Sequence, residues 1–134
     1  MLHVDGGARG NPGPAGVGVV VTDEDGHELA RANAYIGETT NNVAEYRAVL
    51  LGLDQAQALG IGELEIVNDS ELVARQLTGE YRVKKEELRL LHDQAKRALE
   101  GFERWSIRSV PRARNEVADS LVNEAIDARA STTG

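Results

Sequence analysis

Cysteine, long apolar runs and positive charge are the features that this sequence lacks or has little of. Without cysteine, the chain has no disulfide framework, no thiolate zinc site and no cysteine nucleophile. No apolar run approaches the roughly 18 to 20 residues that cross a bilayer, and the N-terminus lacks the order of regions that marks a signal peptide. We therefore expect a cytoplasmic protein with no membrane contact.

Positive charge is scarce and unevenly distributed. The 134 residues carry 15 basic and 22 acidic side chains, a net charge of −7. This balance argues against a nucleic-acid partner, because phosphate binding needs a basic surface. Residues 81–114, however, hold 10 basic and 5 acidic side chains, whereas residues 1–80 hold 4 and 13. The basic segment is either a solvated helix face or a modest surface for a polyanion.

The hydrophobic pattern changes its period along the chain and predicts an α/β domain. Alternating or β-branched stretches predict strands, and apolar residues spaced by three and four predict helices. The expected strands cover residues 2–5, 16–22, 27–36, 64–67 and 103–110, and the expected helices cover 42–59, 70–77, a segment from Leu88 to Phe102 and a closing segment from Ala118 to Ile126. This order predicts a five-stranded mixed sheet, begun by a three-strand meander, with helices on both faces.

The length of the chain is that of one domain with a single core. We expect residues 1–130 to form this domain and to be monomeric. The small, polar residues 131–134 are expected to be a flexible tail or the stub of a linker to a further domain.

Four acidic residues stand near the ends of predicted elements. Asp5 ends the first strand, Asp69 follows the fourth strand, and Glu45 and Asp119 lie in the first turns of two helices. Each has an ordinary explanation as a turn former, a cap or a partner of the helix dipole.

Together, these acidic residues indicate a metal site. Strand ends and helix starts of an α/β sheet meet at one edge, and four carboxylates there repel one another unless cations lie among them. Oxygen ligands favour Mg²⁺ or Mn²⁺, and paired ions serve phosphodiester hydrolysis. The three histidines His3, His27 and His92 are scattered and are not expected to form a second ligand set.

Four motifs in order carry a resemblance to a known family. They are DGGARGNPGPAG at 5–16, TTNNVAE at 39–45, NDS at 68–70 and VPRARNEVAD at 110–119. This series resembles type 1 ribonuclease H, or ribonuclease HI. The resemblance implies a ribonuclease H-like fold and an endonuclease that hydrolyses the RNA strand of RNA–DNA hybrids with two Mg²⁺ or Mn²⁺ ions. The products would carry 5′-phosphate and 3′-hydroxyl ends.

The resemblance also assigns roles by position. Asp5 would serve both metals, Asp119 the metal on the water side, and Glu45 with Asp69 the leaving-group side. Substrate contacts would come from polar residues near these carboxylates, namely Asn11, Thr40, Asn41, Asn42 and Ser70. An amide suits this role because it can both donate to and accept from a 2′-hydroxyl, and Thr40 can donate to a phosphate. The alternative for Asn41 or Asn42 is a helix cap.

The loop before the last aspartate departs from the best-known pattern of the family. Residues 111–118 contain no histidine, and Arg112 stands where a handle-less subgroup of the family has an arginine. Arginine stays protonated, so Arg112 cannot be a general base; it would hold phosphate or stabilise developing charge. The alternative is a solvated loop arginine.

The basic handle helix of the long-handled members is also missing. Substrate grip would then rest on Arg82, Lys84 and Lys85, with Tyr81 packing against a sugar, and binding would be weaker and less steeply dependent on salt. The alternative for Tyr81 is a half-buried aromatic on the core.

Two further residues bear on this reading. Glu71 stands where many relatives have a neutral glutamine that contacts the hybrid, and Trp105 is expected in the core.

Three functions are consistent with these motifs. The first is hydrolysis of RNA–DNA hybrids, with double-stranded RNA as a second candidate substrate. The second is a catalytically weak module of the same fold that binds hybrid or double-stranded RNA. The third, a junction resolvase of the same broad fold, would not require the asparagines at positions 11, 41 and 42.

Overall fold

The five strands predicted from the sequence form one mixed sheet in the computed structural model, which describes residues 1–129 and 132–133. The strands are β1 (Leu2–Ala8), β2 (Gly13–Thr22), β3 (Glu28–Thr39), β4 (Glu63–Asn68), β5 (Arg104–Ser109) and the two-residue β6 (Thr132–Thr133). Their order is β5-β4-β1-β2-β3-β6. The strands from β1 to β3 pair antiparallel as a meander, and β4 is parallel to both β1 and β5. The predicted fold class is therefore confirmed.

The predicted tail falls partly outside the described residues. Ser131 and Gly134 are not among them, whereas Thr132 and Thr133 pair antiparallel with Asn33 and Ala32 of β3. The short strand β6 thus extends the sheet beyond the five predicted strands. The domain boundary at residue 130 stays a prediction.

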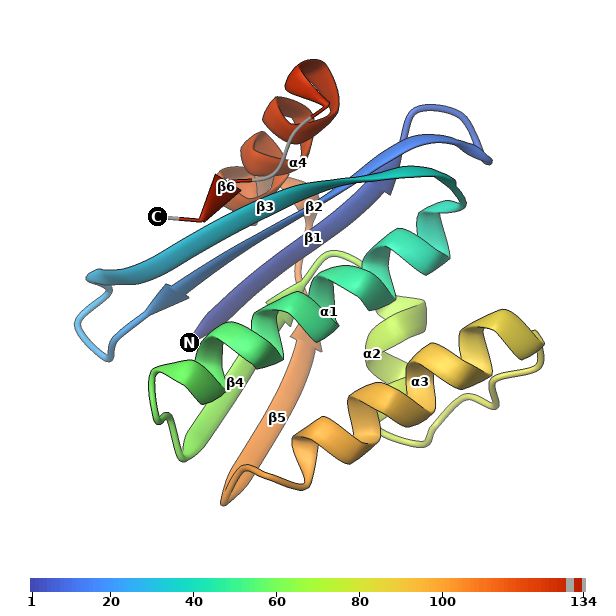
Figure 1. The fold of residues 1–134 in the computed structure, drawn as a ribbon. Coiled ribbons are helices and arrows are strands. Elements are labelled where there is room, and N and C mark those ends of the chain that lie inside the picture. Colours follow the sequence, from blue (N-terminus) through green and yellow to red (C-terminus); the bar gives the residue numbers. More distant parts are fainter. Residues whose placement is uncertain (130–131, 134) are drawn as a thin grey trace.

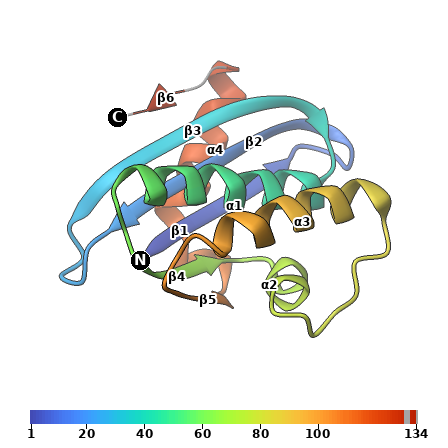
Figure 2. The same ribbon diagram turned by 60° about the horizontal axis from the view of Figure 1, so that its bottom comes forward.

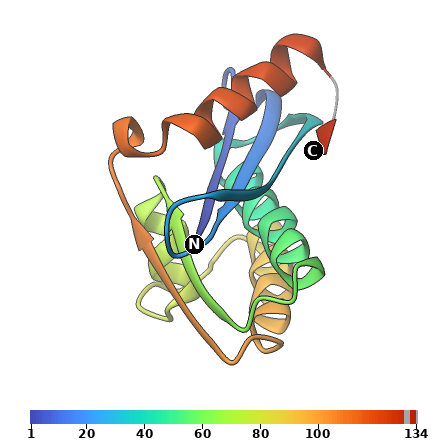
Figure 3. The same cartoon turned by 90° about the vertical axis from the view of Figure 1, so that its left-hand side faces the viewer.

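Helices cover both faces of the sheet. They are α1 (Asn41–Ala58), α2 (Glu71–Leu77), α3 (Glu86–Leu99) and α4 (Glu116–Ala128), and a short 3-10 helix spans Arg112–Arg114. Helices α1 and α3 lie side by side on one face, with α2 next to them (Figures 1 and 2). Helix α4 lies on the other face, across β1, β2 and β3 (Figure 3). None of the helices in the described residues is both long enough and apolar enough to cross a membrane.

The apolar side chains form two layers, one on each face of the sheet. The larger layer lies under α1 and α3 and includes Tyr46 and Leu53, which are fully buried. The smaller layer lies under α4, where Leu121 and Val122 are buried against β2. Helix α4 approaches so closely that a Cβ on Gly18 would meet the carbonyl oxygen of Ala118. Helix α4 therefore packs with its backbone close to β2, in addition to its apolar side-chain contacts with the sheet.

Strand β1 is longer than the sequence pattern suggested. The pair Gly6 and Gly7 was expected to end the strand, but pairing with β2 continues to Ala8, so Asp5 lies in the middle of the strand. Glycine is needed at position 6 for packing rather than to end the strand, since a Cβ on Gly6 would overlap the backbone carbonyl of Ala44 in α1. Glycine at this position lets helix α1 rest directly on the strand that carries Asp5.

This close approach predicts a large effect for a small substitution. Gly6→Ala is expected to lower the free energy of unfolding by about 3 kcal/mol, because neither backbone can move aside without losing pairing. Urea unfolding followed by circular dichroism measures it. Gly7→Ala is the matched control, since its Cβ would lie 4.0 Å from the Val122 side chain. Equal losses from the two substitutions would contradict the packing argument.

Candidate active site

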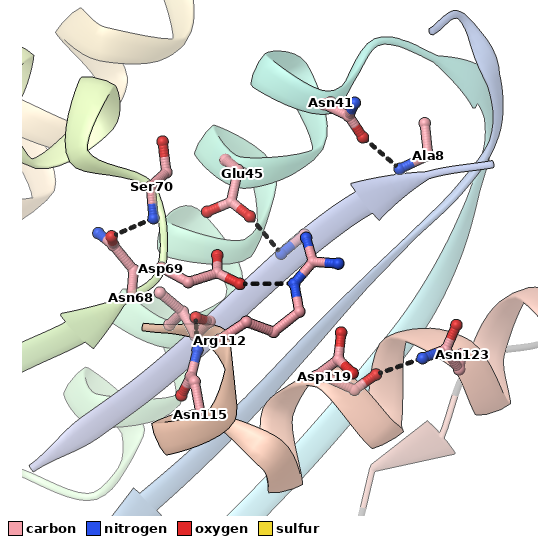
Figure 4. Close-up of polar contacts among 12 residues, drawn as sticks. Ala8, Asn41, Glu45, Asn68, Asp69, Ser70, Arg112, Asn115, Asp119 and Asn123 are labelled. Carbon is pink, nitrogen blue, oxygen red and sulfur yellow. Dashed lines mark hydrogen bonds and ion pairs between the residues drawn. The ribbon is translucent and has the colours of Figure 1, made fainter. Parts of the chain in front are cut away.

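Carboxylates from separate elements meet at one edge of the sheet. Asp5 of β1, Glu45 of α1 and Asp69 after β4 each offer an oxygen, and these oxygens all lie within 4.8 Å of one another. Asp119 of α4 lines a cavity of about 210 Å³ together with Asp5. Figure 4 shows Glu45, Asp69 and Asp119 pointing toward a common region from three different elements. The structure thus brings all four predicted carboxylates together.

The carboxylate cluster is buried and electrostatically strained. Asp5 is 2% exposed and Glu45 is 6% exposed. Burial, followed by the negative charge of Asp69, raises the pKa of Asp5 from 3.8 to about 8. Burial, followed by the charges of Asp5 and Asp69, raises the pKa of Glu45 well above its usual value. Protons or cations must therefore accompany these side chains near neutral pH.

The cluster suits a divalent cation. Asp5 Oδ1 and Glu45 Oε2 are buried carboxylate oxygens without a hydrogen-bond partner among the described residues. The second oxygen of Glu45 accepts a hydrogen bond from the backbone N–H of Gly6 at 3.1 Å, which fixes the carboxylate in place. Unpartnered buried oxygens are costly, and a hard cation would satisfy them. These residues could therefore hold a divalent metal ion.

The position of Glu45 differs slightly from the prediction. Helix α1 begins at Asn41, one residue earlier than expected, so Glu45 lies in the second turn rather than the first. The Glu45 side chain thus accepts its hydrogen bond from Gly6 at the second turn of α1 rather than at the start of the helix.

Arg112 reaches one of these carboxylates, that of Asp69. Its Nε donates a hydrogen bond to Asp69 Oδ2 at 3.2 Å, and its side chain is 73% exposed, against 7% for Asp69. Its pKa is raised mainly by this bond to Asp69, with smaller contributions from Asp5 and Asp119. Arg112 therefore lies at the carboxylate site, where an arginine that holds phosphate would have to lie. Its side chain nevertheless remains accessible to solvent.

Asn115 lies in the predicted loop before Asp119 and has a structural role that the sequence pattern does not indicate. It is 3% exposed, and its Nδ2 donates to the carbonyl oxygen of Val4 at 2.8 Å. The backbone carbonyl oxygen of Asn115 accepts a hydrogen bond from the backbone N–H of Asp119 at 3.0 Å. Asn115 thus ties the loop of Arg112 and the start of α4 to β1, one residue before Asp5. The signal available in the sequence was an asparagine directly before a predicted helix.

The predicted substrate-reading asparagines form a chain along the same edge. Asn11 Oδ1 accepts from the N–H of Asn41 at 3.0 Å, and Asn41 Oδ1 accepts from the N–H of Ala8 at 2.8 Å. Because each carbonyl oxygen is engaged, the amide N–H groups are what these side chains offer to a ligand.

Neither Asn41 nor Asn42 caps helix α1. The cap is Thr40, whose hydroxyl oxygen accepts from the N–H of Val43 at 3.3 Å. The other predicted contact, Ser70, caps α2 in the same way by accepting from Val73.

The predicted basic grip lies away from the carboxylates. Tyr81, Lys84 and Lys85 are exposed on the loop between α2 and α3, and they do not line the carboxylate cavity. Tyr81 is 46% exposed, and the Arg75 guanidinium lies 5.4 Å from its ring centre. The carboxylate of Glu71 accepts a 2.7 Å bond from Arg75, so its charge is paired along α2.

Two other sequence expectations meet the structure differently. Trp105 is half-buried beside the core, with the ammonium of Lys96 over its ring. His27, which was not expected to belong to a second ligand set, lies with Asp23 and Asp25 in the β2–β3 turn, where ligand atoms of all three lie within 4.8 Å. Asp23 is already engaged there, because it accepts from two backbone N–H groups of the turn. The hydrogen bonds of Asp23 thus give this cluster a structural role in closing the β2–β3 hairpin.

Comparison with known proteins agrees with this geometry. The family model described as "Reverse transcriptase-like" matches residues 3–125. The crystal structure of RNase H1 from Halobacterium salinarum is 46% identical, covers 94% of this chain and 96% of that chain, and superposes with a TM-score of 0.91. The chain belongs to the ribonuclease H family. Among solved ribonuclease H structures, LC11-RNase H1 in complex with an RNA/DNA hybrid is 46% identical, with a TM-score of 0.91 and 96% coverage of both chains.

Some relatives of this ribonuclease H domain are longer proteins. A bifunctional protein of Mycobacterium tuberculosis is 47% identical over 98% of this chain, which spans 36% of that protein's length. The N-terminal RNase H domain of the same protein has been solved and superposes with a TM-score of 0.91, covering 95% of this chain and 94% of that chain. Ribonuclease HI of Halobacterium salinarum is 46% identical over 93% of this chain, which spans 63% of that protein's length.

Proposed function

We propose that this domain is an endonuclease that hydrolyses the RNA strand of RNA–DNA hybrids and depends on divalent metal ions. The observation that carries the proposal is the meeting of four carboxylates at one sheet edge, with two of their buried oxygens unpartnered. The chain's likeness to a ribonuclease H1 solved with an RNA/DNA hybrid supports the choice of substrate. The products would carry 5′-phosphate and 3′-hydroxyl ends.

The carboxylates would act as the metal-holding groups. Asp5, central among them, would contact both ions, with Asp119 on the water side and Glu45 and Asp69 on the leaving-group side. Two bound Mg²⁺ or Mn²⁺ ions supply activation of a water molecule and stabilisation of charge on the phosphate. The hydrogen bond from Gly6 and the close packing of α1 on β1 keep Glu45 in place before any ligand arrives.

The polar edge beside the carboxylates would recognise the RNA strand. Asn11 and Asn41 have their carbonyl oxygens fixed by the backbone and present N–H donors, which suit 2′-hydroxyl groups. Asn42, Thr40 and Ser70 continue this edge at the starts of α1 and α2. These contacts distinguish RNA from DNA, because only RNA carries a 2′-hydroxyl.

The basic loop between α2 and α3 would supply the remaining grip. Arg82, Lys84 and Lys85 are exposed there, next to Tyr81, and would contact backbone phosphates at a distance from the cut. Few such contacts predict weak binding with a shallow dependence on salt.

Arg112 is expected to contribute to turnover by holding the phosphate or stabilising its developing charge. Arg112→Ala should lower kcat for a labelled hybrid by about 10²-fold, the typical cost of one preorganised electrostatic group. Arg112→Lys should recover part of the loss. Arg114→Ala is the matched control, because Arg114 lies in the same 3-10 helix but does not bond Asp69. Equal losses in the Arg112 and Arg114 variants would contradict a specific role.

Gel analysis of labelled substrates tests the proposal. The chain is incubated with an RNA–DNA hybrid, duplex RNA and branched DNA, with Mg²⁺, with Mn²⁺ or with a chelator. We expect metal-dependent cutting of the RNA strand of the hybrid and no cutting by the Asp69→Asn variant. Hybrid binding without cutting would instead show a binding module, and preference for branched DNA would show a resolvase. Labelling of the product ends checks for the 5′-phosphate.

A further inference from the structure

The cavity beside the carboxylates contains a second arginine that the proposed mechanism does not use. Arg9, in the turn after β1, lines the same cavity of about 210 Å³ as Asp5, Asp119 and Arg112. It is the only lysine or arginine in residues 1–30. The cavity is therefore bordered by two guanidinium groups that come from different loops and by two of the proposed metal-holding carboxylates.

The backbone around Arg9 is fixed beside the substrate-reading edge. The N–H of Arg9 donates to the carbonyl oxygen of Pro14 at 2.9 Å, which closes the turn. The preceding N–H, that of Ala8, donates to Asn41. Arg9 thus starts from a defined position next to two of the residues proposed to read RNA.

The side chain of Arg9 is held by partners that it can exchange. Its Nη1 lies 2.6 Å from Asp127 Oδ1, and its Nη2 donates to Asn123 Oδ1 at 3.3 Å, both on α4. The side chains of Arg9 and Asp127 are 47% and 67% exposed, and exposed ion pairs contribute little to stability. The two parallel N–H groups of a guanidinium fit a phosphate as well as they fit a carboxylate. The side-chain oxygens of Asp127 and Asn123 therefore accept from the two Nη groups of Arg9 in the way that two phosphate oxygens would.

We propose that Arg9 is a substrate-binding residue that holds a backbone phosphate of the hybrid next to the phosphate being cut. In the free protein, Asp127 takes the place of that phosphate. The inference rests on the proposed function and adds a contact that the four motifs do not assign. Its electrostatic logic is that a polyanion entering an acidic cavity needs fixed positive charge at the rim, and Arg9 and Arg112 supply it from two sides.

The competing explanation is that Arg9 only fastens the β1–β2 turn to α4. The two explanations differ in what they predict for Asp127. If the ion pair is a fastener, removing either member has the same effect. If Arg9 binds phosphate, loss of Arg9 weakens substrate binding, whereas loss of Asp127 frees Arg9 and strengthens it.

The experiment measures KM and kcat for a labelled hybrid in Mg²⁺ at rising KCl, together with the melting temperature, using the full chain. Arg9→Ala should raise KM by about tenfold, leave kcat within about twofold, and reduce the slope of log KM against log salt by about 1. Arg9→Lys should fall between Arg9→Ala and the unchanged protein, and Asp127→Asn should lower KM. Arg31→Ala and Glu124→Gln remove the same charges elsewhere on the surface and should change KM by less than about twofold.

Two results would overturn the inference while leaving the proposed function in place. One is an unchanged KM and salt slope in Arg9→Ala. The other is a rise in KM in both Arg9→Ala and Asp127→Asn with matching losses in melting temperature, which is the signature of a fastener. Failure of the unchanged protein to cut the hybrid would overturn the proposed function, and this inference with it.

Discussion

Asp5→Asn is expected to lower hydrolysis of an RNA–DNA hybrid by at least about 10³-fold, or about 4 kcal/mol in the activation barrier. Asp5 has ligand oxygens within 4.8 Å of those of Glu45 and Asp69, and it lines the same cavity as Asp119. Asparagine keeps the shape of the side chain but removes the charge that would hold cations. Steady-state cleavage of a labelled hybrid in Mg²⁺ measures the loss.

The control for this substitution is an exposed carboxylate of the same kind. Asp25→Asn changes a side chain in the β2–β3 turn, on a different part of the surface, and should retain activity within about twofold. Isothermal titration of Mg²⁺ into both variants separates lost metal binding from lost turnover. Near-normal cleavage by Asp5→Asn would remove Asp5 from the catalytic set.

The metal-free protein is expected to lose stability as pH rises from about 4 to about 8. The pKa of Asp5 is 3.8 when exposed and about 8 in the folded chain, so the folded state holds a proton that the unfolded state has released. The stabilising contribution is therefore fully present below pH 4 and is lost as pH rises toward 8, at up to about 1.4 kcal/mol per pH unit. The raised pKa of Glu45 acts in the same direction.

Urea unfolding in a chelator at several pH values measures this dependence. Asp5→Asn should flatten the fall and make the metal-free protein more stable than the unchanged chain at pH 8, while Asp25→Asn should follow the unchanged chain. Addition of Mg²⁺ should restore stability at high pH, because a cation replaces the proton. A flat profile for the unchanged metal-free protein would show that the carboxylates are not strained.

Much of the fold could be predicted because the hydrophobic period reports which faces are buried. Helix α1 repeats its apolar residues at three and four, and β4 is a short apolar run, so each element was predicted close to its observed bounds. The convergence of Asp69 and Asp119 with the other two carboxylates followed from topology, since strand ends and helix starts share an edge, although Asp5 lies within β1 and Glu45 in the second turn of α1.

What could not be predicted depended on contacts between elements distant in sequence. Gly6 looked like a strand breaker, yet its role is to admit the backbone of α1, which no local pattern reveals. Asn115 could be predicted only as a loop residue. Its structural role depends on a hydrogen bond to Val4, and the two positions are more than 100 residues apart in the sequence. Arg9 and Asp127 are similarly far apart in the chain, so their ion pair was visible only in three dimensions.

The two apolar layers of the sheet also bear on how the chain opens and closes. The layer under α4 is small, and its buried residues are separate from the larger cluster under α1 and α3. A helix held by a small separate layer is expected to detach as its own cooperative unit, below the cost of global unfolding. Each such event would carry Asp119 away from Asp5, so amide hydrogen exchange in α4 would report directly on the fraction of molecules with an incomplete site. A divalent cation held by Asp5 of β1 and Asp119 of α4 together would then join two parts of the protein that otherwise open separately.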